Sequence, residues 1–113
     1  MLSRQERQQT YDEIGKIKGE IEQIKSQIDQ IKSRIDMNWS SIRENREAIK
    51  YHVKEARKPH MRDIGFQGHG LETQVYELQQ SNSRLHDEKN ELYQRMNTLH
   101  ARKQELYGKL DNK

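Results

Sequence analysis

Three histidines near the middle of the chain, His52, His60 and His69, are the residues whose chemistry is easiest to name. Together with Asp63 they offer imidazole and carboxylate groups of the kind that bind zinc and other transition metals. Ligands on one helix face lie three or four residues apart, whereas these histidines are separated by eight and nine. We therefore expect solvated histidines and no metal site.

The segment GFQGHG, residues 65–70, has the glycine content of a phosphate-binding loop. It lacks the GxxxxGK[ST] order and the preceding strand that such loops require. The chain has no Cys, so thiolate nucleophiles and disulfides are excluded. No Ser, His and acid arrangement and no buried pair of carboxylates can be proposed either. We expect no catalytic residue, no cofactor and no enzymatic activity.

Positive charge is concentrated in residues 43–62. This segment contains seven lysines and arginines and three glutamates, a net charge of +4, whereas the whole chain has a net charge of +3. Such a cluster can simply be a solvated helix end, because cations suit the C-terminal end of a helix. It can also bind an acidic protein surface or phosphates.

We expect the middle of the chain to contact a protein partner. Charged side chains would attract this partner, and the last two residues of the contact would anchor it by apolar packing. The expected contact residues are Arg57, Lys58, His60, Met61, Arg62, Ile64 and Phe66. The alternative is a nucleic-acid-associated protein that uses the basic cluster on phosphates. Its additional contacts would be Arg43, Arg46, Lys50 and Lys54.

The elements that would position these residues follow from apolar spacing. Between residues 14 and 35 isoleucines recur at alternating intervals of three and four, the pattern of a coiled-coil seam. No proline interrupts residues 3–57, so one long helix is predicted there. Past Ile35 the strict heptad runs through Asn38 and Ile42. A stutter that instead brings Trp39, Arg46 and Val53 into the seam is the alternative.

A second heptad pattern follows the only proline. Leucine occupies every seventh residue from Leu71 to Leu106, and the positions between include Asn82 and Lys89. This stretch resembles the leucine zippers of dimeric coiled coils, which identifies a type of interaction and not a family. A basic-zipper protein is not expected, because the basic region of such a protein runs unbroken into its zipper and here Pro59 intervenes.

The predicted fold is all-α: a single coiled-coil domain with a helix at 3–57, a turn at 58–70 and a helix at 71–111, folded as an antiparallel hairpin. An extended parallel coiled coil with a central break is the alternative. For the hairpin we predict that Ala56 faces Leu71, which brings Asn45 opposite Asn82 and Asn38 opposite Lys89. A slip of one heptad that faces His52 with Asn82 is a second possible register.

A hairpin of two helices has a thin core, so we expect self-association into a homodimer, for which a four-helix bundle is one arrangement. The predicted oligomer seam comprises Ile14, Ile17, Ile21, Ile24, Ile28, Ile31, Ile35, Ile42, Ile49, Leu71, Val75, Leu78, Asn82, Leu85, Leu92, Met96, Leu99, Leu106 and Leu110. No apolar run is long enough for a signal-peptide core or a membrane span. An intracellular protein with no membrane contact is therefore expected.

Overall fold

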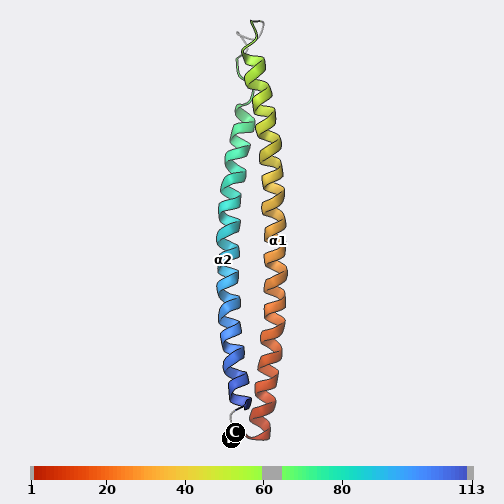
Figure 1. Ribbon diagram of the computed structural model, residues 1–113, viewed down its shortest axis with the longest axis vertical. Coiled ribbons are helices and arrows are strands. Elements are labelled where there is room, and N and C mark those ends of the chain that lie inside the picture. The colour runs from red at the N-terminus through yellow and green to blue at the C-terminus, as the bar shows by residue number, and fades with distance from the viewer. Residues whose placement is uncertain (1, 60–64, 112–113) are drawn as a thin grey trace. The chain divides into compact units, whose positions relative to one another are not determined.

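The computed structural model describes residues 2–59 and 65–111 and contains two long helices (Figure 1). Helix α1 covers Arg4–Ala56 and helix α2 covers His69–Asp111. The expected bounds, 3–57 and 71–111, lie within two residues of these, and the end at 111 coincides. The predicted all-α architecture of two long helices that pack against each other is confirmed.

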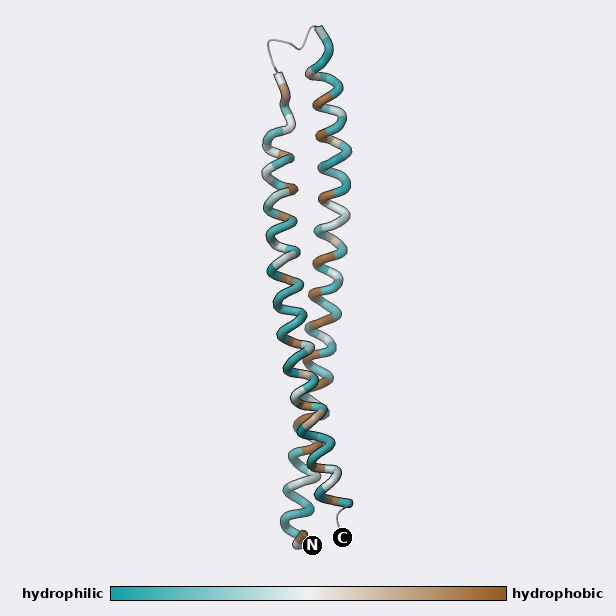
Figure 2. Tube along the Cα trace, turned by 60° about the vertical axis from the view of Figure 1, so that its left-hand side comes forward, coloured by the Kyte–Doolittle hydropathy of each residue, from teal (hydrophilic) through white to brown (hydrophobic). Residues whose placement is uncertain are grey.

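Contacts divide the chain into two units. Unit 1 consists of Met1–Gln30 and Glu88–Lys113, and unit 2 consists of Ile31–Asp87. In each unit a part of α1 lies beside a part of α2 that runs in the opposite direction (Figure 1). The helices pair as in a hairpin, so the parallel alternative is wrong. Figure 2 shows short hydrophobic stretches recurring along both helices between hydrophilic ones, as the heptad pattern predicts.

The start of α1 is fixed by a reciprocal pair of hydrogen bonds. The backbone N–H of Glu6 donates to Ser3 Oγ at 3.1 Å, and the backbone N–H of Ser3 donates to Glu6 Oε1 at 3.4 Å. This capping box satisfies N–H groups that have no partner within the helix. The end of α1 tightens, because Lys58 N–H donates to the Glu55 carbonyl three residues back, and Pro59 follows.

In unit 1 the isoleucines of α1 form the core. Ile14, Ile17 and Ile21 are at most 5% exposed and form a cluster with Leu106. Leucines and other apolar residues of α2 pack against this cluster: Met96, Leu99, Tyr107 and Leu110. Thr10, one heptad step before Ile17, is also buried, and its hydroxyl donates to the Glu6 carbonyl at 2.8 Å. The apolar stripe of α1 is therefore covered by α2 of the same chain.

In unit 2 the strict heptad holds. Ile35 and Ile42 are buried, and Ile42 is 0% exposed. Trp39 and Val53 are exposed, at 39% and 37%, and Arg46 is exposed as well. A stutter would have placed these three side chains in the seam, so that alternative is wrong. The polar positions Asn38 and Asn45 lie half-buried beside α2.

The predicted register is wrong by one heptad. In unit 2 Asn38 Nδ2 donates to Asn82 Oδ1 at 2.9 Å, and it does not face Lys89 as predicted. Asn45 donates to Gln74 Oε1 at 3.1 Å and does not pair with Asn82. Continued by heptad steps within unit 2, this register sets Ile42 opposite Leu78 and Ile35 opposite Leu85. The second register, with Asn82 facing His52, is excluded by the same bonds.

Unit 1 shows why the prediction failed. Its criterion was to match polar residues with polar residues, and Asn82 meets a polar residue in the predicted register, in the slipped register and in the observed one. In the observed unit 1 Ile14 packs in one cluster with Leu106, and Met96 reaches the same cluster. The predicted register would have set Leu106 opposite Ile21 and left Ile14 beyond the last leucine of α2. Covering one more isoleucine is worth about 2 kcal/mol, which exceeds the net gain from one neutral hydrogen bond.

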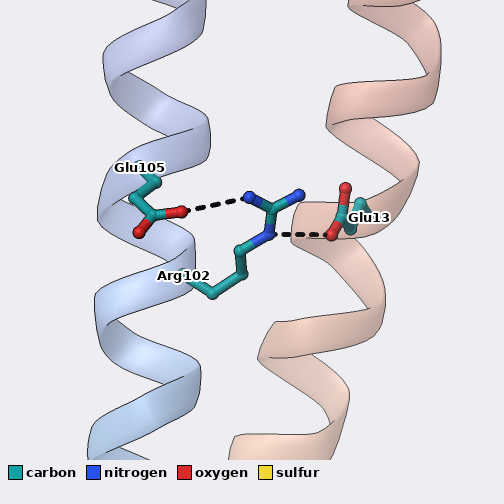
Figure 3. A network of polar contacts seen from close by, with 3 residues as sticks. All are labelled: Glu13, Arg102 and Glu105. Carbon is teal, nitrogen blue, oxygen red and sulfur yellow. Dashed lines mark hydrogen bonds and ion pairs between the residues drawn. The ribbon is translucent and has the colours of Figure 1, made fainter.

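Across unit 1 an ion-pair network joins the flanks of the two helices (Figure 3). Arg102 on α2 donates from Nε to Glu13 Oε1 on α1 at 3.1 Å, and from Nη1 to Glu105 Oε2 at 3.0 Å. Both carboxylates favour the charged guanidinium, Glu105 most strongly, and so raise the pKa of Arg102. The partners are about half exposed, so the network specifies which flanks meet more than it stabilises the fold.

The register can be tested by a double-mutant cycle on the two asparagines. Asn38→Ala and Asn82→Ala should be coupled by about 1 kcal/mol in the free energy of unfolding, because each removes the same hydrogen bond. The pair Asn45→Ala and Asn82→Ala is the control and should be additive within about 0.5 kcal/mol. Denaturant unfolding followed by helical circular dichroism measures both. Coupling in the control pair alone would support the rejected register.

Burial along the seam can be tested with two isoleucines of the same heptad position. Ile42→Ala should lower the free energy of unfolding by about 2–5 kcal/mol, because the side chain is fully enclosed. Ile49→Ala should cost clearly less, since Ile49 is only half-buried. The same unfolding measurement compares them. Equal losses would show that the seam is covered equally at both positions, contrary to the structure.

Candidate partner-binding surface

The end of α1 and the two residues that follow it carry a group of cations that we call the basic end: Lys50, Lys54, Arg57 and Lys58. All four side chains are exposed. Arg43 and Arg46 precede them at helical spacing, so that residues 43, 46, 50 and 54 follow one side of α1, and Arg57 continues this spacing just past its end. The cations predicted to bind phosphates and the first two of those predicted to contact a protein therefore share one surface.

An open hollow of about 530 Å³ lies on the basic end. Its lining combines three cations with one carboxylate and two other side chains: Glu47, Lys50, Tyr51, Val53, Lys54 and Arg57. Tyr51 is 59% exposed, and Val53 is exposed as well. Phenol and isopropyl groups beside ammonium and guanidinium groups suit a ligand that brings both negative charge and apolar surface.

Part of the positive charge is already balanced within unit 2. Lys50 Nζ lies 3.3 Å from Glu47 Oε1, and Lys58 Nζ lies 2.7 Å from Glu55 Oε1. The hydrogen bond with Glu55, together with the charge of that carboxylate, raises the pKa of Lys58, which keeps this ammonium protonated. Among the described residues Lys54 and Arg57 form no ion pair with a carboxylate. Within the basic end, and among the described residues, these two cations are the ones without a carboxylate partner.

The connection between the helices is described only at its two ends. Four residues of the predicted partner contact, His60, Met61, Arg62 and Ile64, lie outside the described residues, as does Asp63. Phe66 is half-buried, with its ring edge against His69 at 4.8 Å between centroids. A Cβ on Gly68 would collide with this ring, and Gly65 has φ +74°, in the left-handed region that favours glycine. The two glycines thus shape the backbone that holds Phe66.

Two contributors to this surface were not predicted. Tyr51 and Val53 both line the hollow, yet neither stood among the expected contact residues. The signal was present in the sequence, since both are apolar or aromatic and lie off the strict heptad.

Within residues 2–59 and 65–111 no cluster of three or more potential metal ligands occurs. In that same part of the chain neither helix has a stretch apolar and long enough to cross a bilayer.

Comparison with known proteins adds no further assignment to this surface. No family model, no curated protein and no solved structure matches the chain.

Proposed function

We propose that this protein is a non-enzymatic, self-associating coiled-coil scaffold that presents the basic end of α1 and the central connection to an acidic protein partner. The observation that carries the proposal is the grouping of Lys54 and Arg57, which have no carboxylate in an ion pair among the described residues, with exposed Tyr51 and Val53 around one hollow. An acidic segment with an aromatic or aliphatic side chain fits this combination.

The interior supports a structural role. The side chains enclosed between the described parts of α1 and α2 are chiefly isoleucine and leucine, which offer no acid, base or nucleophile. The hydroxyl of buried Thr10 is used by a backbone carbonyl. The groups that can contact other molecules therefore lie on the outer surface. Charged and aromatic side chains can bind a partner there, but water is not excluded as it is from a catalytic pocket.

Self-association is the second part of the proposal. Two paired helices enclose a narrow core, and small folds of this kind gain much of their stability from further packing. Exposed large apolar side chains occur in both units, among them Tyr11, Met37, Trp39 and Tyr76. A second copy that covers some of them would lower the free energy of the folded state.

The partner surface can be tested with a fluorescent peptide rich in glutamate that carries one tryptophan per heptad. We expect it to bind, and we expect Lys54→Glu with Arg57→Glu to weaken binding at least about tenfold, because two attractive contacts become repulsive. Lys16→Glu, an exposed lysine of the same helix in unit 1, is the matched control and should have little effect. Fluorescence anisotropy measures each affinity.

Salt and nucleic acid distinguish the two candidate functions. Binding of the peptide should fall only partly between 50 and 200 mM salt and should depend on Tyr51, because apolar contacts are not screened. A phosphate-binding protein would instead prefer duplex DNA or single-stranded RNA and lose affinity steeply over that range. Preference for either nucleic acid, or equal peptide binding by the Lys54 and Arg57 variant, would overturn the proposed function.

A further inference from the structure

The outer face of α1 in unit 2 has a charge order that is its own complement. Lys32, Asp36, Trp39, Arg43 and Glu47 follow one another at intervals of four, three, four and four, so they lie on one side of the helix. All five side chains are exposed, and they lie off the seam positions Ile35 and Ile42 that α2 covers. From one end this face reads positive, negative, tryptophan, positive, negative.

Opposite charges stand at equal distances on either side of the Trp39 region. Asp36 and Arg43 are the inner pair, and Lys32 and Glu47 are the outer pair. A second copy laid antiparallel across this point would meet each charge with its opposite. A parallel copy would instead set Asp36 against Asp36 and Arg43 against Arg43, which is repulsive. The charge order therefore selects one orientation.

In the described part of the chain no ion pair joins these charges within a single copy, although Lys32 and Asp36, like Arg43 and Glu47, stand at the four-residue spacing at which one helix can pair them. Asp36 and Arg43 are seven residues apart, which is about 10 Å along the helix axis and beyond the reach of an ion pair. In the described part of the chain Asp36 forms no ion pair, and Arg43 donates only to Ser40 Oγ, at 3.2 Å. Glu47 pairs with Lys50, but both side chains are about three-quarters exposed, so this pair competes weakly.

We propose that unit 2 pairs with a second copy of itself through this face, antiparallel, with a twofold axis beside Trp39. Asp36 of each copy meets Arg43 of the other, and Lys32 meets Glu47. Trp39, which is 39% exposed in the single chain, supplies the apolar centre, while the four reciprocal ion pairs around it set register and orientation. The proposal rests on the self-associating part of the proposed function and identifies its surface.

Complementary charge reversals test this arrangement. Asp36→Arg and Arg43→Asp should each weaken self-association at least about tenfold, because like charges then meet twice across the axis. An equimolar mixture of the two variants should regain it, since two arginines of one chain would face two aspartates of the other. Light scattering and native mass spectrometry at low salt measure the stoichiometry. Trp39 is the only tryptophan, so a blue shift of emission reports burial of the centre.

Two controls distinguish loss of the dimer contact from loss of the fold. Arg34→Asp, on the opposite side of α1, should leave self-association unchanged, and circular dichroism should show intact helices in all variants. A wild-type chain that stays monomeric, single variants that associate like the wild type, or a mixture that forms no mixed dimer would each overturn the proposal. Lys54 and Arg57 remain intact in these variants. A wild-type chain that dimerises but does not bind the peptide would refute the proposed partner surface and leave this inference standing.

Discussion

The structure depends on one constraint, which is that a stripe of isoleucine repeated every three and four residues must be removed from water. Each such side chain gains about 1.5–3 kcal/mol from full burial, more than the roughly 0.5–1.5 kcal/mol that a neutral hydrogen bond contributes. In both units α2 provides the cover, and the described isoleucines from Ile14 to Ile35 are at most 7% exposed. Helix length, antiparallel pairing and the exposure of the polar faces follow from this requirement.

Polar groups within the seam lower the stability of the fold but help to define the register of the two helices. Asn82 is 4% exposed, and its Oδ1 accepts a hydrogen bond from Asn38, but its buried Nδ2 has no partner within the described chain. A leucine at either position would enclose more apolar surface, yet it would remove the contact that fixes register in unit 2. A slip of seven residues keeps most seam isoleucines covered and differs by about one isoleucine at the helix ends, so the amide pair adds to that difference in favour of the observed register.

Helix content, the two long elements and the strict heptad could be predicted because periodicity is a local property of the sequence. The register could not, because shifts by whole heptads keep every seam residue inside and differ only at the ends and at the polar layers. The prediction paired Asn82 with Asn45 where the structure pairs it with Asn38. The basic end could likewise be read from charge. The sequence also shows that Tyr51 and Val53 lie off the heptad, but only the structure shows that both line one hollow with the cations.

Because the seam uses the isoleucines and leucines, specificity toward other molecules has to come from what the outer faces carry. Those faces are rich in charge, and most charges alternate at spacings that pair within a turn, as Lys25 does with Glu22. Residues that break this local balance are therefore the informative ones. In the described part of the chain Lys54 and Arg57 form no ion pair with a carboxylate, and Asp36 and Arg43, seven residues apart, do not pair with each other. Isolated charge beside an exposed aromatic ring marks a surface that gains from being covered, because a partner supplies both the opposite charge and the apolar contact.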